Sequence, residues 1–131
     1  MEQPTVDCVA RALAEGLDGA GSAAVAGYLG ESTLLHMPGA SGFSGDYQGS
    51  DAIRGLLDRL SAASRGTLRF ETVRITHGRD GRVRLWGKVS GRQRQRVLAM
   101  TATLEVFVEG STLREAWLSS ADEKAWDEFW S

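Results

Sequence analysis

The stretch LLHMPGASGFSGDYQGSDAIRGLLDRL, residues 34–60, changes character three times and decides the fold. Its apolar start ends near His36, and Pro38 with Gly39 closes the run, which predicts a short strand over Ser32–Met37. A glycine-rich loop from Gly39 to Gly49 follows, and an amphipathic segment comes after the loop. His36 is therefore either a catalytic group at the mouth of a pocket or the polar end of a buried strand.

The amphipathic segment after the loop predicts a helix. Its apolar side chains recur at helical spacing and form one stripe, made of Ile53, Leu56, Leu57 and Leu60. Ser50 or Asp51 can cap the helix, because a short side-chain oxygen satisfies the free N–H groups of the first turn. Gly66 is a suitable stop at the C-terminal end.

Two more helices are expected before this stretch. The first carries its apolar face on Val6, Val9, Ala10, Leu13 and Leu17. The pattern breaks at Asp18, Gly19, Gly21 and Ser22. A second, short helix is expected to carry Val25, Tyr28 and Leu29.

From residue 67 onward the pattern predicts strands, over residues 67–77, 82–90, 96–109 and 112–119. The great length of the second and third of these suits a strongly curved antiparallel sheet. A short C-terminal helix follows, with Ser120 and Glu123 as its capping box. Helices followed by a run of strands indicate the α+β class, and we expect one domain over residues 1–131 with helices on one face of the sheet.

Composition excludes several classes of function. The formal net charge is −2, from 15 basic and 17 acidic residues, so nothing in it favours nucleic acid or an anionic membrane as a partner. No run approaches the roughly 20 apolar residues of a membrane span, and the first residues do not resemble a secretory signal. We therefore expect a cytoplasmic protein. Two histidines and one cysteine make no cluster with metal-ligand spacing, so no metal site is expected.

The opening stretch, taken with LEVFVEGSTLREAWLSSADEKAWDEFW near the C-terminus, resembles the SnoaL-like and ketosteroid-isomerase-like branch of the nuclear transport factor 2 (NTF2-like) fold superfamily. The motifs that carry the resemblance are H-x-P-G at 36–39, G-x-Y-x-G at 45–49, and E-x-W followed by D-x-x-A-x-D-x-F-W near the end. The resemblance covers nearly the whole chain. It implies a cone of three N-terminal helices packed on a strongly curved antiparallel sheet, with a deep apolar pocket inside.

The same resemblance implies a homodimer through the outer sheet face and no metal or organic cofactor. Members of this branch include isomerases, polyketide cyclases, epoxide hydrolases and dehydratases, and the fold alone does not select among them. Ketosteroid isomerases carry an aspartate base next to the proline that ends the first strand. Here His36 and Met37 precede Pro38, so steroid isomerisation by that arrangement is not expected.

His36 is the first candidate for catalysis, because a neutral imidazole accepts or donates a proton near pH 7. The alternative is a structural histidine that bonds a loop carbonyl. Asp46 and Tyr47 lie on the loop before the helix. Asp46 can serve as a base, and the Tyr47 hydroxyl can bond a substrate carbonyl and stabilise an enolate. The alternatives are an Asx-type turn for Asp46 and packing under the helix for Tyr47.

Strand alternation adds Glu115 to the catalytic candidates. In TLREAWLSS, one face carries Leu113, Glu115, Trp117 and Ser119. Leu113 and Trp117 are expected to face the helices, which would place Glu115 on the pocket side. An ion pair with an arginine is the structural alternative. The candidates for substrate binding are Tyr28, Trp86, Met100 and Trp117, whose alternative role is packing in the core.

These observations favour a small cofactor-free enzyme that performs acid/base chemistry on an apolar molecule bearing a carbonyl group, such as a polyketide-type metabolite. The reaction would be an isomerisation, a cyclisation or a dehydration, with His36 carrying the proton and Tyr47 or Glu115 as its partner. The alternative is a non-catalytic protein of the same fold that binds a small ligand or acts as a dimeric scaffold. The sequence leaves the substrate and the role of Glu105 open.

Overall fold

The protein is described by a computed structural model that covers residues 6–17, 22–79 and 81–130. Within these residues, six strands form one sheet in the order β2-β1-β6-β5-β4-β3. The strands are β1 (Leu29–Met37), β2 (Gly45–Gln48), β3 (Arg69–His77), β4 (Arg82–Gln93), β5 (Arg96–Glu109) and β6 (Thr112–Ser120). The helices are α1 (Val6–Glu15), α2 (Ser50–Ala63) and α3 (Glu123–Trp130), with a 3₁₀ turn, η2, at Ala26–Tyr28.

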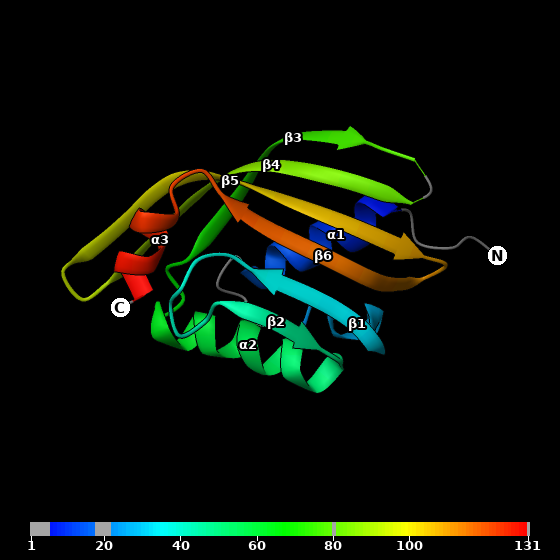
Figure 1. The fold of residues 1–131 in the computed structure, drawn as a ribbon, viewed down its shortest axis with the longest axis horizontal. Coiled ribbons are helices and arrows are strands. Elements are labelled where there is room, and N and C mark those ends of the chain that lie inside the picture. Colours follow the sequence, from blue (N-terminus) through cyan, green and yellow to red (C-terminus); the bar gives the residue numbers. More distant parts are fainter. Residues whose placement is uncertain (1–5, 18–21, 80, 131) are drawn as a thin grey trace.

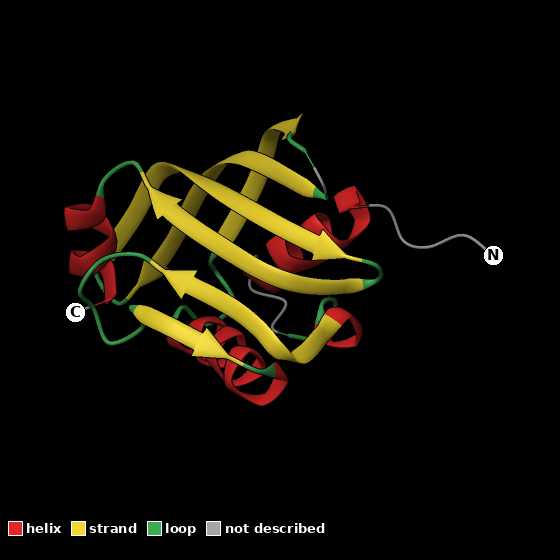
Figure 2. Cartoon of the chain, turned by 45° about the vertical axis from the view of Figure 1, so that its right-hand side comes forward, coloured by secondary structure: helices red, strands yellow, loops and turns green. Residues whose placement is uncertain are grey.

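The helices gather on one side of the sheet and leave the other side bare. Helix α1 packs against β3, β4 and β5, and α2 packs against β1 and β2. Figure 1 shows α1 behind β5 and β6, α2 below β1 and β2, and α3 at one end of the sheet. Figure 2 shows the same separation after a 45° turn. We call the bare side the helix-free face. Architecture of this kind confirms the α+β class.

The core fills the space between the sheet and the helices. Side chains on every second strand position point into it, as the alternation of a half-buried strand requires. On β1, Leu35 and Met37 are buried, whereas His36 between them is only partly covered. His36 therefore lies on the helix-free face. This face, rather than the interior, receives the polar side chains of the central strands.

Helix α2 forms as its apolar stripe predicts, with Ile53, Leu56, Leu57 and Leu60 buried against the sheet. The expected cap by Ser50 or Asp51 is wrong. The N-cap is Gly49, which has a φ of 91° and provides no side-chain bond to the first turn. At the other end Gly66, with a φ of 72°, donates its N–H to the Ser61 carbonyl, as expected of a glycine stop.

The N-terminal part contains one α-helix in the described residues, not the two that were expected before the first strand. The segment expected to form the second helix makes only the 3₁₀ turn η2, and Leu29 already belongs to β1. Formation of the first turn of an α-helix is unfavourable, and a three-residue segment adds too few further hydrogen bonds to offset it. The pairing of Leu29 with β6 also prevents the helix from extending past Tyr28. The predicted break at Asp18, Gly19 and Gly21 lies outside the described residues.

The sheet is mixed rather than wholly antiparallel, because β1 runs parallel to β6. Parallel neighbours need a long connection, and here it contains β2, α2 and the strands β3 to β5. Strand β2 lies inside the segment expected to be a loop. It pairs antiparallel with β1, so that Asp46 lies opposite His36. The capping box at Ser120 and Glu123 is also wrong, since the Asp122 carboxylate accepts the N–H of Ala125.

No helix among the described residues is long and apolar enough to cross a membrane. Strands β3 to β6 match their predicted starts and ends within three residues.

We expect Gly39→Ala to destabilise the fold. Gly39 has a φ of +84°, and a methyl group there would lie 2.1 Å from Oδ1 of Asp127, which accepts the N–H of Ala40 across to α3. The backbone strain alone costs about 1–3 kcal/mol in the free energy of unfolding, and displacement of Asp127 adds to it. Urea unfolding measures the loss.

Gly42→Ala in the same loop is the matched control, because a methyl group there meets nothing within 4 Å. Equal unfolding free energies for the two variants would contradict the described approach of the loop to α3.

Candidate functional site

Three neighbouring strands place His36 between two carboxylates. In the sheet register, His36 of β1 lies opposite Asp46 of β2 on one side and next to Trp117 of β6 on the other. Nδ1 of His36 is 2.7 Å from Oδ1 of Asp46, and Nε2 is 2.6 Å from Oε2 of Glu115. These distances are those of charge-assisted hydrogen bonds. An imidazolium ring with both nitrogens protonated donates to both carboxylates at once.

The indole of Trp117 supports this cluster from one side. The rings of His36 and Trp117 are stacked, with centroids 5.6 Å apart and an angle of 18° between their planes. The guanidinium of Arg82 lies over the same indole, 5.8 Å from its centroid. The imidazole orientation is thus fixed by two hydrogen bonds and a flat apolar surface. We call His36, Asp46 and Glu115 the His36 cluster.

The His36 cluster is accessible from solvent. The side chains of His36 and Glu115 are 26% and 31% exposed, and that of Asp46 is 73% exposed. Partial burial of the ring works against its charged form. The hydrogen bonds and negative charges of Asp46 and Glu115 outweigh this effect and raise the pKa of His36 above its ordinary value of 6.5. The two carboxylates therefore favour the protonated form of the ring.

A bulge in β6 decides which residues join the cluster. Phe107 pairs with Glu115 but Val108 pairs with Leu113, so Arg114 is an extra residue in the ladder. Leu113 consequently points into the core, while Glu115 and Trp117 lie on the helix-free face. The expectation that Leu113, Glu115 and Trp117 share the helix-covered side is wrong, because a shift of one residue moves a side chain to the other face.

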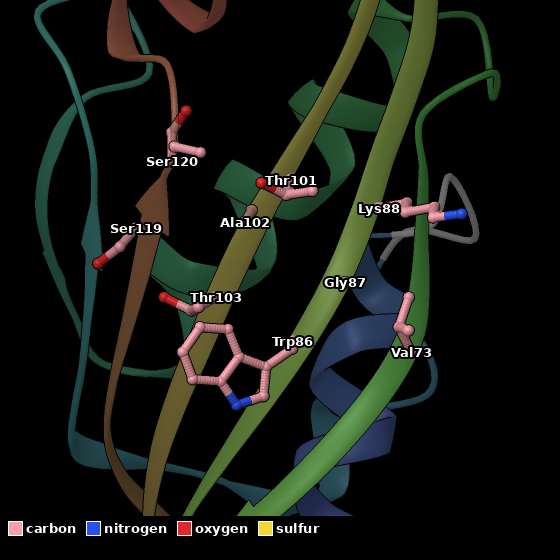
Figure 3. Close-up of a pocket in the computed structure, with 10 residues that line it drawn as sticks. Val73, Trp86, Gly87, Lys88, Thr101, Ala102, Thr103, Ser119 and Ser120 are labelled. Atoms are coloured by element: carbon pink, nitrogen blue, oxygen red, sulfur yellow. The ribbon is translucent and has the colours of Figure 1, made fainter.

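A groove of about 490 Å³ lies on the same face of the sheet as the His36 cluster. Its walls include Val73, Trp86, Lys88, Thr101, Thr103 and Ser119. Figure 3 shows these side chains in front of the strands, with helices behind the sheet. Ser119 follows Trp117 by two residues on β6, about 7 Å along the strand. A ligand in the groove can therefore reach toward Trp117 and the cluster.

Between the groove and the cluster runs a row of charged and aromatic side chains. Glu105 accepts a hydrogen bond from Nε of Arg84 at 3.2 Å and lies 3.7 Å from Nη1 of Arg82. Arg74 and Arg84 place their guanidinium groups over the indole of Trp86, 4.8 and 5.5 Å from its centroid. Glu105, which the sequence left open, is thus an ion-pair residue on the helix-free face.

The other predicted site residues lie apart from the cluster. Tyr47 is on the helix-covered side, next to Leu35, and its hydroxyl donates to the Phe43 carbonyl at 3.0 Å. Met100 points to that side too and accepts a bond from Ser120. Tyr28 packs against the core, with its hydroxyl 4.0 Å from the Cys8 sulfur. The structure therefore brings together His36, Asp46, Glu115 and Trp117 and separates Tyr28, Tyr47 and Met100 from them.

The sequence reasoning missed the polar lining of the groove. Thr101 and Thr103 share one strand face with Glu105, and Lys88 shares a face with Trp86, so alternation alone groups them. The alternation does not show on which side of the sheet the groove lies. No group of three or more His, Cys, Asp or Glu side chains in the described parts of the chain has the geometry to hold a metal ion.

No protein-family model matches the chain, and no curated protein matches it. Solved structures do match along nearly its whole length. A protein of unknown function with a cystatin-like fold from Xanthomonas campestris has a TM-score of 0.87 at 21% identity, covering 98% of this chain and 99% of that one. Bal32a, from a soil-derived mobile gene cassette, has a TM-score of 0.85 at 21% identity, covering 96% and 98%.

A third structure is a putative polyketide cyclase from Xanthomonas campestris, with a TM-score of 0.76 at 14% identity, covering 96% of each chain. Others of this fold are named as SnoaL-like polyketide cyclases, an NTF2-like protein and a protein with a ketosteroid-isomerase-like fold. One, TerC, was co-crystallized with polyporic acid. These likenesses confirm the NTF2-like fold that the sequence predicted. At such identities they establish the fold alone.

The His36 cluster predicts a stability that depends on pH. A raised pKa in the folded state means that the stabilisation is fully present below the unfolded-state pKa, near 6.5, and is lost as pH rises through the folded-state pKa. We expect the unfolding free energy of the wild type to exceed that of His36→Gln by more at pH 5.5 than at pH 9. Urea unfolding at both values measures this.

His77→Gln is the matched control, because His77 also meets a carboxylate, Asp7 at 2.7 Å, but its side chain is 62% exposed. A difference between wild type and His36→Gln that stays constant with pH would contradict the described cluster.

Proposed function

We propose that this chain is a small enzyme that performs acid/base chemistry on an apolar molecule bearing a carbonyl group. The reaction class is isomerisation, cyclisation or dehydration. The observation that carries the proposal is the imidazole of His36 held between two carboxylates, on the same face of the sheet as an open groove. Structures of the same fold named as polyketide cyclases support the substrate class.

Glu115 is placed to exchange a proton with the substrate. Its Oε2 bonds His36, whereas Oε1 accepts no hydrogen bond from any residue that the structure describes. Oε1 would take a proton from the carbon next to the substrate carbonyl. The C–H bond breaks, its electron pair forms the enolate, and the proton resides on Glu115 until it returns to another carbon or to a leaving oxygen. His36 donates to Glu115 throughout and controls its basicity.

Asp46 and Trp117 act as positioning residues in this scheme. Asp46 holds Nδ1 of His36, so that Nε2 faces Glu115. Trp117 stacks on the ring and keeps it in that plane. The hydroxyls of Thr103 and Ser119 lie at the groove end toward Trp117, where they can bind a polar group of the ligand.

A second candidate function is binding of a small apolar ligand without chemistry, which the apolar floor of the groove favours. The floor is made of Gly87 and Ala102, next to Trp86. Native mass spectrometry of the protein purified from its own host separates the two functions, when read with the exchange experiment below. A retained ligand with no proton exchange favours carriage.

The acid/base proposal predicts that the wild type accelerates deuterium exchange at the carbons next to the carbonyl of 2-tetralone, followed by proton NMR in D₂O. Glu115→Gln and His36→Gln should each lower the rate by roughly 10²-fold or more, because the first removes the base and the second removes the group that controls its basicity. His77→Gln should exchange at the wild-type rate. No acceleration by the wild type, or full rates in both cluster variants, would sink the proposal.

We also propose that two copies pair through the helix-free face, leaving the groove enclosed between them. Val73, on the wall of the groove, is a large apolar side chain that is 61% exposed. Val73→Glu should shift the protein from dimer to monomer, as measured by light scattering after size exclusion, because a buried unpaired charge is costly.

Val97→Glu is the control, since Val97 is 69% exposed but lies at the hairpin between β4 and β5, outside the groove. A monomeric wild type at micromolar concentration would contradict the pairing.

A further inference from the structure

We propose that the groove on the helix-free face binds flat aromatic carboxylates, with the aromatic ring against Trp86 and the carboxylate at Lys88. This inference rests on the proposed function, because it names the substrate class of the same site. It is carried by the shape, the wall and the charge of the groove.

The size of the groove suits a molecule of one to three rings. Small-molecule sites in proteins have volumes of about 300–1,000 Å³, and this groove has about 490 Å³. Gly87 and Ala102 are at strand positions that face the core, so neither sends a side chain into the groove, and its floor there is strand backbone. On the core side, a methyl group at Gly87 would lie 2.6 Å from the ring of Phe70. A planar ligand can lie close to the strands at this point.

Trp86 gives the groove a flat aromatic wall of fixed orientation. Its Nε1 donates to Oγ1 of Thr76 at 3.4 Å, and the guanidinium groups of Arg74 and Arg84 lie over its indole. Figure 3 shows the indole at one end of the groove, beside Thr103. An aromatic ring gains from stacking on such a surface beyond the area that it buries.

The charge around the groove favours an anion. Lys88 is the ionisable side chain in the wall, and it forms no ion pair with the residues that the structure describes. Arg74, next to Trp86, is likewise committed to the indole rather than to a carboxylate. These two cations leave a positive potential at the end of the groove away from the His36 cluster.

The carboxylates that could cancel this potential are few and mostly engaged. Glu105 pairs with Arg82 and Arg84, and Asp122 at the rim caps α3 through the N–H of Ala125. Glu71 lies directly opposite Lys88 in the ladder of β3 and β4, without an ion pair between them. Among the described residues, Glu71 is therefore the carboxylate placed to compete with a bound anion for Lys88.

Hydroxyl groups in the wall of the groove can bind the polar groups of such a ligand. Thr101 stands beside Lys88 in the register of β4 and β5, and Thr103 and Ser119 lie at the opposite end, toward Trp117. A ligand whose carboxylate meets Lys88 directs the far edge of its ring system toward the His36 cluster. A carbonyl on that edge then lies where Thr103 and Ser119 donate. Lys88 is thus a specificity residue that sets the direction of the substrate.

The test compares 2-naphthoate with 2-naphthylmethanol, which has the same ring system without the charge, by isothermal titration calorimetry. The wild type should bind the naphthoate at least tenfold more tightly. Lys88→Met should abolish this preference and leave the affinity for the alcohol unchanged. Trp86→Leu should weaken both ligands. Glu71→Gln should tighten the naphthoate severalfold, because it removes the competing carboxylate.

Lys124→Met is the matched control, since Lys124 is the other lysine of the chain and lies on α3. Circular dichroism confirms that each variant is folded. Equal affinity of the wild type for acid and alcohol, or no binding of either at 1 mM, would overturn the inference. Exchange of 2-tetralone, which carries no charge, tests the proposed function separately. If the protein does not accelerate this exchange but still binds naphthoate, the proposed acid/base function is contradicted and the proposed binding site stands.

Discussion

The pairing of β1 with β2 on one side and with β6 on the other is the constraint on which the site depends. It places residues 46, 36 and 117 in one row across three strands. Because neighbouring strands lie about 4.8 Å apart, an imidazole in the middle of such a row reaches groups on both sides. The bulge at Arg114 then turns Glu115 onto the same face, and the second carboxylate meets the ring.

This arrangement moves the candidate chemistry from the interior of the fold to the helix-free face. On the helix-covered side, β1 contributes Leu35 and Met37 to a packed apolar core. On the other side, the partly exposed imidazole, the charged row at Glu105 and the groove beside Trp86 follow one another across the sheet. The imidazole–carboxylate cluster, the charged row and the apolar groove are thus neighbours on one surface. If two copies pair through this face, the same residues become a chamber between them.

The sequence predicted those parts of the fold whose signal is periodic. The stripe of α2 and the alternation of the long strands appear in the structure nearly as expected, because burial on one side imposes a period on many residues. His36, Asp46 and Glu115 were chosen for their chemistry, and the structure joins them. Strand β2 was missed because a segment of four residues between glycines has too few alternating positions to be recognised as a strand.

The remaining errors come from pairing, which no local pattern contains. The face of Glu115 and Trp117 depends on one extra residue at Arg114. Tyr47 is separated from His36 because it pairs with Leu35, whose side chain points to the opposite face of the sheet.

The protonation of the His36 ring tests the account most directly. Long-range ¹H–¹⁵N NMR at pH 6.5, where an ordinary histidine is half protonated, should show both ring nitrogens predominantly protonated, and Asp46→Asn should lower the protonated fraction. A ring that is predominantly neutral at that pH would contradict the account.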